Sequence, residues 1–206
     1  LHHDGFDHQV IHNLELDIEY HHKNVDYLEN FIDIYKNPDE VINIAICGKY
    51  NSLHDAYKSI LEAFIHSGIE NETQVKVKWV DTEELEENRN LDAACNNVDG
   101  ILIPGGFGTR GIEGKIIVSK YARENGIPFL GICLGLQCAI IDFARHVCGW
   151  NNANSTEFIK NCKSPVIDLM QGQRKVKSKG ATMRLGSYPC RVRNKTLASN
   201  AYGKRD

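Results

Sequence analysis

The stretch Gly131-Ile132-Cys133-Leu134-Gly135 joins an apolar run, residues 127–132, to a helical pattern that starts at Leu134. Glycine stands two residues before and two residues after the cysteine. In such a turn the strand and the helix approach so closely that larger flanking side chains would collide, and the central residue takes a strained backbone conformation. The stretch therefore predicts a nucleophile elbow in an α/β fold, with Cys133 at its tip.

Cys133 would stand at the N-terminus of a helix, where unpaired N–H groups and the helix dipole favour the thiolate, the attacking species. The alternative is that Cys133 merely ends a buried strand, as we expect of Cys47. Two further cysteines in the following helix, Cys138 and Cys148, lack flanking glycines and are predicted to be core residues.

The segments around this turn alternate between strand-like apolar runs and helical patterns. Strands are predicted at 41–47, 74–80, 98–104 and 127–132, and helices at 55–66, 114–125 and 134–149. Because this order requires parallel strands joined by helical crossovers, we predict a flavodoxin-like, mostly parallel sheet with helices on both faces. The first helix should end at Gly68 as a C-terminal cap, and the acidic run 81–89 should be a solvated helical turn.

The two ends of the chain depart from this pattern. Residues 1–40 hold six of the nine histidines and are predicted to be a linker with a connecting helix. The apolar positions of that helix should pack on the body of the protein; they are Val25, Leu28, Phe31, Ile32 and Tyr35. The compact domain is assigned to residues 41–206, with a short strand at 182–188. The histidine pairs lack metal-ligand spacing, so no metal site is predicted.

Composition excludes several functions. The 206 residues include 24 basic and 27 acidic side chains, so the net charge of −3 gives no reason to expect a nucleic acid partner. The longest apolar runs fall far short of the roughly 20 residues that span a bilayer, so no membrane partner is expected. Seven cysteines, an odd number without CxxC spacing, favour a reducing compartment and hence a cytoplasmic location.

A second motif, Pro104-Gly105-Gly106-Phe107-Gly108, follows the third strand, at the edge of the sheet where ligands bind. It lacks the Lys-Ser/Thr pair of a nucleotide P-loop, which makes a phosphate cradle the weaker interpretation. With a nucleophile one strand away, the N–H groups of Gly106 and Leu134 are predicted to form an oxyanion hole for a tetrahedral intermediate. Such an arrangement belongs to acyl transfer.

Together the two motifs resemble the class I (triad) glutamine amidotransferases, whose cysteine hydrolyses glutamine to glutamate and ammonia. Further stretches are similar to the glutaminase domain of the CTP synthase family. These are residues 48–50, 55–59, 110–115, 121–125, 153–158 and 183–186. The resemblance runs almost continuously over residues 41–206, and residues 1–40 resemble the linker from a preceding synthetase domain.

The resemblance implies a role for each matching residue. Cys133 would be the nucleophile, and Gly106 and Leu134 would shape the oxyanion hole. The substrate-binding turn would continue through Gly135, Leu136 and Gln137, and Gln137 and Glu157 would hold the glutamine. A carboxylate such as Glu157 suits an α-ammonium group, although an exposed loop acid is an equal alternative on the residues alone. Arg110 would belong to a mobile lid that responds to GTP.

One feature departs from the family pattern. The family places its catalytic histidine and glutamate well downstream of the cysteine, and this sequence has no histidine after His146. His146 itself would lie about 20 Å from Cys133, at about 1.5 Å per residue along one helix. We therefore expect the catalytic pair to follow Asp206, and this chain alone to be poorly active.

The implied function is that of the glutaminase domain of CTP synthase, which supplies ammonia for the ATP-dependent amination of UTP to CTP. No cofactor would bind in this domain; ATP and Mg would bind the separate synthetase domain, and GTP would act as an allosteric activator. The partners would be L-glutamine and that synthetase domain, in a homotetramer when full-length and a monomer here. One alternative is a non-catalytic, amidotransferase-like binding or regulatory module. Another is a cysteine-elbow hydrolase or chaperone, which would need a histidine where Leu134 stands.

Overall fold

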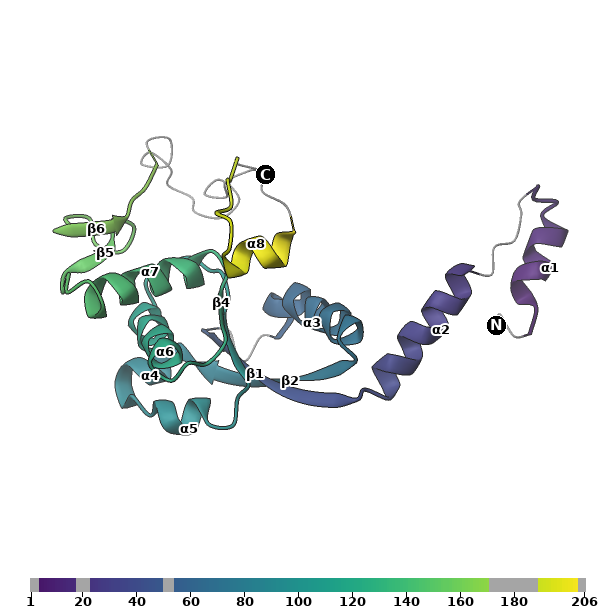
Figure 1. Cartoon of the computed structure of the whole chain (residues 1–206), viewed down its shortest axis with the longest axis horizontal. Coiled ribbons are helices and arrows are strands. Elements are labelled where there is room, and N and C mark those ends of the chain that lie inside the picture. Colours follow the sequence, from purple (N-terminus) through teal and green to yellow (C-terminus); the bar gives the residue numbers. More distant parts are fainter. Residues whose placement is uncertain (1–3, 18–22, 50–53, 171–188, 204–206) are drawn as a thin grey trace.

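A computed structural model describes residues 4–17, 23–49, 54–170 and 189–203 (Figure 1). Its main sheet has four strands in the order β2-β1-β3-β4, and every neighbouring pair is parallel. The strands are β1 (Glu40–Gly48), β2 (Thr73–Asp81), β3 (Gly100–Ile103) and β4 (Phe129–Gly131). The chain moves from β1 to one edge and then to the other, which is the flavodoxin-like order. The predicted sheet is confirmed.

Helices cover both faces of this sheet because successive side chains of a strand point to opposite sides. Val77 of β2 lines a cavity with Phe64 of α3 (Lys58–Glu70), a helix that follows the short 3₁₀ turn η1 (His54–Tyr57). Val80 points the other way and shares a buried cluster with Val118 of α6 (Ile112–Glu124). The prediction that helices cover both faces of the sheet is therefore confirmed.

The acidic run 81–89 differs from its prediction as a solvated turn. It forms α4 (Thr82–Asn88), which starts with Asp81 Oδ1 accepting the N–H groups of Glu83 (2.7 Å) and Glu84 (3.3 Å). Thr82 and Leu85 are buried. The helix packs closely against α6 because α6 has a glycine, Gly114, at the point of contact. A Cβ at this position would collide with the Thr82 carbonyl. After α4, the crossover to β3 is completed by α5 (Leu91–Cys95).

Gly68 does not cap α3 as predicted. It lies in the last turn of the helix and is buried, and Asn71 is the C-terminal cap. A Cβ at Gly68 would collide with the Thr73 carbonyl oxygen. The glycine is therefore a point of close approach between α3 and β2, which the sequence pattern alone does not distinguish from a helix stop.

The helix after the elbow, α7 (Leu134–His146), ends three residues before the predicted boundary at residue 149. Cys138 is fully buried, as predicted, whereas Cys148 lies beyond the helix and is exposed, so its assignment to the core is wrong. A small parallel pair, β5 (Ala153–Ser155) and β6 (Ser164–Ile167), follows, and α8 (Leu197–Tyr202) stands near the end. The strand predicted at 182–188 lies outside the described residues.

Ion pairs fix α7 against its neighbours. Asp142, only 2% exposed, accepts hydrogen bonds from Arg123 of α6 through Nε (2.9 Å) and Nη2 (3.2 Å). Arg145 binds both carboxylate oxygens of Glu113 and donates through Nε to the Ala153 carbonyl (2.8 Å). These contacts connect α6, α7 and β5, and they hold the helix that carries the elbow.

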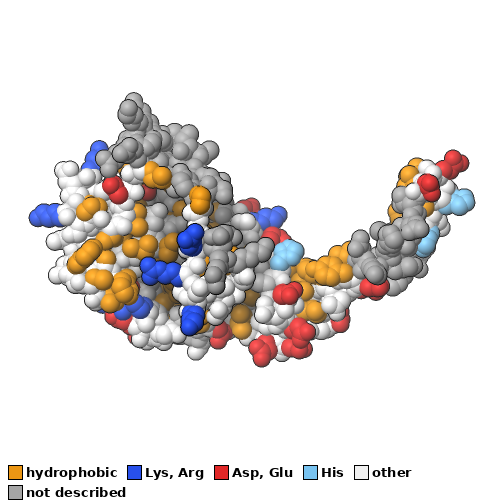
Figure 2. All heavy atoms as spheres, turned by 45° about the horizontal axis from the view of Figure 1, so that its top comes forward, with side chains coloured by type: hydrophobic (Ala, Val, Ile, Leu, Met, Phe, Trp, Pro, Cys, Tyr) orange, Lys and Arg blue, Asp and Glu red, His pale blue; other side chains and the backbone are white. Residues whose placement is uncertain are grey.

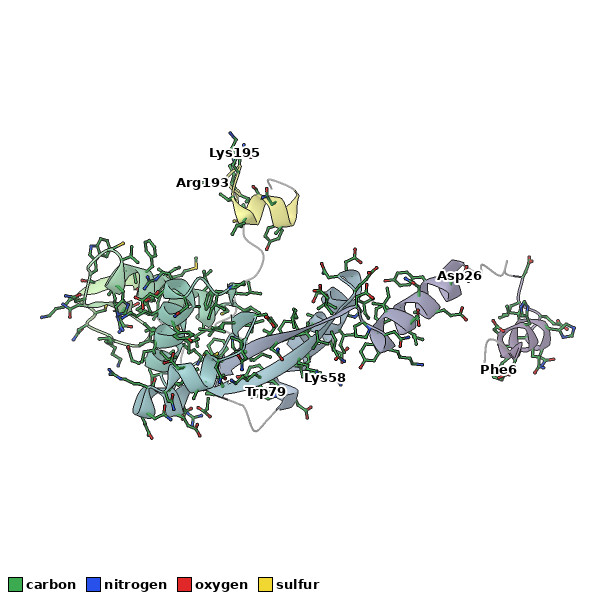
Figure 3. The ribbon with its side chains drawn as sticks, turned by 60° about the horizontal axis from the view of Figure 1, so that its bottom comes forward. Phe6, Asp26, Lys58, Trp79, Arg193 and Lys195 are labelled. Atoms are coloured by element: carbon green, nitrogen blue, oxygen red, sulfur yellow. The ribbon has the colours of Figure 1, made fainter. Side chains whose placement is uncertain are left out.

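The N-terminal part forms an arm of two helices, α1 (Phe6–Asn13) and α2 (Lys23–Lys36), that extends away from the body (Figures 1 and 3). The predicted packing of the α2 stripe is mostly wrong, since Leu28, Ile32 and Tyr35 are exposed. Among the described side chains of α2, the ring centroid of Phe31 lies 5.7 Å from that of His66, and Tyr35 lines a cavity with Phe64 of α3. The side chain of Val25 lies outside the described residues. None of the described helices is both long and apolar enough to cross a membrane.

Candidate active site

The elbow predicted around Cys133 is present. The Ile132 N–H donates to the Ile103 carbonyl (2.9 Å), and the Gly135 N–H donates back to the Ile132 carbonyl (2.9 Å). Between these bonds Cys133 takes φ 53° and ψ −104° and stands at the N-cap of α7. A positive φ is strained for a residue with a Cβ, and the surrounding hydrogen bonds hold it in place.

The flanking glycines are required by contact. A Cβ on Gly131 would lie 2.6 Å from the Gly135 carbonyl carbon and 2.6 Å from the Leu136 nitrogen. A Cβ on Gly135 would collide with the Ile103 carbonyl oxygen. Any larger residue at either position would push α7 away from β3 and β4, so the G-x-C-x-G spacing follows from the packing of strand against helix.

The loop at 104–108 lies directly beside the elbow. A Cβ built on Gly105 would be 3.4 Å from the Cys133 Cβ, and one built on Gly106 would be 3.7 Å from Leu134 Cδ2. Within the described part of the chain, neither the Gly106 N–H nor the Leu134 N–H donates to a protein acceptor. Two unused donors beside the nucleophile are what an oxyanion hole requires.

Lys49 holds this loop, a role that the sequence analysis did not assign. Its half-buried ammonium group donates to the Phe107 carbonyl oxygen (2.5 Å). Lys49 directly follows β1, and the glycine loop directly follows its sheet neighbour β3. Because neighbouring parallel strands end at the same edge, this adjacency is a signal that the sequence does contain.

Cys133 is exposed, as are Cys148 and Cys190. Burial raises the pKa of Cys138 to about 12, so this thiol stays protonated at neutral pH. Cys47 also has a raised pKa, because its thiol is hydrogen-bonded to Cys95 and is fully buried. Cys133 alone combines exposure with a helix N-terminus and an adjacent glycine loop.

Gln137 lies one helical turn after the nucleophile, and its backbone N–H donates to the Cys133 carbonyl (3.2 Å). Its side-chain Oε1 is buried and has no hydrogen-bond partner among the described residues. A buried amide oxygen without a donor is unusual in a folded protein and fits a site that a polar ligand completes. Of the other two residues of the predicted binding turn, Gly135 is buried and Leu136 is 54% exposed.

Glu157 stands in the turn after β5, and its N–H donates to the buried Ser155 hydroxyl (3.1 Å). The next residue, Phe158, packs against the buried cluster that contains Leu134 and Cys138. The fold thus brings the Glu157 turn next to a cluster that α6 and α7 share, although β5 was not predicted. Its role in binding the substrate stays a prediction.

Two other residues lie apart from this group. Arg110 is largely exposed, with its Nε 3.6 Å from Glu83 Oε1, so its assignment to a GTP-responsive lid remains a prediction. His146 is at the far end of α7, where its Nδ1 lies 2.8 Å from Asp142 Oδ1. It is therefore engaged away from Cys133. No group of three or more potential metal ligands occurs within the described ranges.

Comparison with known proteins places the site in a family. Residues 52–203 match the family described as glutamine amidotransferase class-I. The chain is 56% identical over 180 residues to a CTP synthase of Chlorobium phaeobacteroides, covering 86% of the chain and 32% of that protein. It is 50% identical over 203 residues to a CTP synthase of Syntrophus aciditrophicus, covering 98% of the chain and 37% of that protein. The chain thus spans about a third of these relatives.

A solved structure is also similar. It is the glutaminase domain of Trypanosoma brucei CTPS with bound acivicin, matched with a TM-score of 0.60 and 41% sequence identity. The match covers 65% of this chain and 52% of that one. The fold predicted from the alternating pattern is therefore the fold of a known glutaminase domain.

Proposed function

The chain belongs to the class-I glutamine amidotransferase family, and from this membership we propose that it is the glutaminase part of a CTP-forming enzyme. The observation that carries the proposal is the position of Cys133. It occupies a strained N-cap beside a glycine loop, and two N–H groups next to it, one from Gly106 of the loop and one from Leu134 of α7, donate to no acceptor among the described residues. This geometry suits attack of a sulfur nucleophile on an amide carbonyl.

The reaction begins when the Cys133 thiolate attacks the side-chain amide carbon of glutamine, forming a C–S bond. The carbonyl oxygen gains negative charge and accepts hydrogen bonds from the N–H groups of Gly106 and Leu134. Collapse of this intermediate breaks the C–N bond, and the leaving nitrogen takes up, through solvent, the proton that the thiol lost on ionising and departs as ammonia. Water then attacks the γ-glutamyl thioester and breaks the C–S bond; the oxygen of the water goes to the released glutamate, and one of its protons restores the thiol.

The substrate is held by groups on both sides of the nucleophile. The Glu157 carboxylate pairs with the α-ammonium group of glutamine, and the unpartnered Gln137 Oε1 accepts a hydrogen bond from the same ligand. An ammonium group that contacts both the Glu157 carboxylate and the Gln137 amide oxygen is bound more strongly than one that contacts only one of these groups. These contacts favour glutamine over simple amides that lack the amino-acid end.

In the longer protein, ammonia passes to a synthetase domain that binds ATP and Mg and aminates UTP to CTP. GTP acts there as an activator, with Arg110 in the responding lid, and the assembly is a cytoplasmic homotetramer. Support for this wider proposal comes from the similar proteins, which are CTP synthases and of which the chain spans about a third. The groups that would bind ATP, Mg and UTP belong to that synthetase domain.

The proposal is tested by alkylation with the chloroketone analogue of glutamine, followed by peptide mapping. Cys133 should be modified first, and L-glutamine should slow the modification whereas D-glutamine should not. The wild-type chain and Cys133→Ala form the matched pair. Labelling of Cys148 or Cys190 in preference to Cys133, or no protection by L-glutamine, would favour the alternative of a non-catalytic module.

A further inference from the structure

We propose that Thr156 is a positioning residue that fixes the Glu157 carboxylate for the substrate's ammonium group. The inference rests on the proposed function, because it assigns a task to the residue next to Glu157. Thr156 stands between the buried end of β5 and the binding residue. It is half-buried and shares the turn that brings Glu157 toward α7.

Three hydrogen bonds converge on Thr156 from the end of β6. Its N–H donates to the Ile167 carbonyl (3.1 Å), and its hydroxyl donates to Asp168 Oδ1 (2.6 Å). The same hydroxyl accepts the Leu169 N–H (3.1 Å). The side chain therefore acts as donor and acceptor at once, so its position is set from two directions.

The pairing of β5 with β6 makes this arrangement possible. Asn154 pairs with Pro165, but Ser155 pairs with Ile167, so one residue of β6 is skipped. Such a bulge bends the strand and changes the direction of the residues that follow. In this case it brings the Ile167 carbonyl and the side chain of Asp168 to Thr156.

The turn is also fixed on its other side. The Glu157 N–H donates to the Ser155 hydroxyl (3.1 Å), and the Phe158 N–H donates to the Ser155 carbonyl (3.1 Å). Glu157 thus stands between two anchored residues, Ser155 and Thr156. Removing the Thr156 hydroxyl would break its bonds to Asp168 and Leu169 and leave only the backbone bond to Ile167 on that side of the turn, while the Ser155 bonds stay intact. The carboxylate would then be less well placed, because its contact with an ammonium group depends on distance and direction.

The experiment compares Thr156→Val, which keeps the shape but loses the hydroxyl, with Thr156→Ser, which keeps it. The probe is the chloroketone analogue of glutamine, and the two measured constants are KI for binding and kinact for alkylation of Cys133. Thr156→Val should raise KI about tenfold, the effect of losing roughly one hydrogen bond's worth of binding. Its kinact should stay within about twofold of the wild-type value. Thr156→Ser, which keeps the hydroxyl, should have the same KI as the wild-type chain.

Two controls separate positioning from general damage. Iodoacetamide has no α-amino group, so its rate with Cys133 should be the same in every variant. Thr73→Val removes a hydroxyl that bonds the Asn71 carbonyl at the start of β2, and it should change neither constant. An unchanged KI in Thr156→Val, or an equal loss with iodoacetamide, would overturn the inference. If the wild-type chain itself shows no saturable, glutamine-protected labelling, the proposed function fails instead.

Discussion

Cys133 keeps its unfavourable backbone angles because glycines on either side allow α7 to approach β3 and β4. The strain is therefore maintained by packing at Gly131 and Gly135, which stand two residues before and two residues after the cysteine. A residue that loosens this packing should release the strain and displace the thiol from the helix N-terminus.

Gly135→Ala should destabilise the fold by roughly 2 kcal/mol or more, because its Cβ would collide with the Ile103 carbonyl oxygen. Gly106→Ala is the matched control, since its Cβ would make only an ordinary contact with Leu134 Cδ2 at 3.7 Å. Chemical denaturation should show the loss for Gly135→Ala and a nearly unchanged midpoint for Gly106→Ala. Equal midpoints for the two variants would contradict the contact argument.

Lys115 of α6 is 2% exposed, and burial lowers its pKa from the usual 10.5. The folded state therefore disfavours the charged form, so the unfolded chain binds more protons between the lowered pKa and 10.5. Stability should rise with pH across that window. Lys115→Met, which removes the buried amine, should be more stable than the wild-type chain at neutral pH and should lack this rise. Thermal melts at several pH values would check it, and a less stable Lys115→Met at pH 7 would contradict it.

At the scale of single residues, the sequence predicts a role only where the motif that indicates it lies within one short stretch of the chain. The glycine spacing around Cys133 and the loop at 104–108 are visible without a structure. Lys115 and Thr156 are not, because their importance comes from groups far along the chain, and Lys49 is indicated only by the expected adjacency of β1 and β3. Lys49 meets the Phe107 carbonyl, and Thr156 meets Asp168 only through a bulged strand pair.

Among the elements, α7 is central because it carries the elbow at one end and a buried carboxylate at the other. Asp142 binds Arg123 through two nitrogens and also lies 2.8 Å from His146 Nδ1. The same interaction with Asp142 raises the pKa of Arg123. The position of α7 relative to α6 therefore depends on one carboxylate that solvent hardly reaches.

Asp142→Asn should reduce the free energy of unfolding by about 2 kcal/mol, because it leaves a partly buried guanidinium group without its charged partner. Glu124→Gln is the control on the same arginine. Glu124 lies 3.7 Å from Arg123 but is 50% exposed, so its loss should cost less than about 0.5 kcal/mol. Urea unfolding measures both. A loss for Glu124→Gln as large as that for Asp142→Asn would contradict the account.

The order and type of the main elements follow from the alternation of patterns, whereas their ends do not. Gly68 was expected to stop α3 but instead admits the Thr73 carbonyl, a tertiary contact. The strands β5 and β6 have only three and four residues, too short for a pattern to show. The burial of α4 also depends on Gly114, a residue of another helix.

At the scale of the whole molecule, the described residues form two exposed apolar surfaces. One runs along α2 in the arm, and the other lies along the outer side of α7 and just beyond it (Figure 2 shows hydrophobic side chains on both the arm and the body). The second surface follows a spacing of four and three residues. Its members are Leu136, Ile140, Phe143, Val147 and Trp150. A helix with apolar residues on both its buried side and its outer side is usually in contact with other protein surface on both sides.

Because this apolar surface is exposed, the chain should associate with itself at high concentration. This expectation differs from the monomeric state that the sequence analysis predicts. Replacing Phe143 and Val147 together by lysine should shift the sedimentation coefficient toward the monomer value. Alkylation of Cys133 should be unchanged, since both side chains are exposed and lie at the C-terminal end of α7, with Val147 as its cap residue. Identical concentration dependence in the wild-type and doubly substituted chains would show that another surface drives association.

The central claim is that Cys133 forms a γ-glutamyl thioester, and hydroxylamine tests it most directly. Hydroxylamine attacks a thioester without needing an activated water molecule, so it reports the first half of the reaction even when release to water is slow. The wild-type chain incubated with L-glutamine and hydroxylamine should yield γ-glutamyl hydroxamate, and Cys133→Ala should yield no more than buffer. Equal amounts of hydroxamate from the wild-type chain and Cys133→Ala would contradict the account.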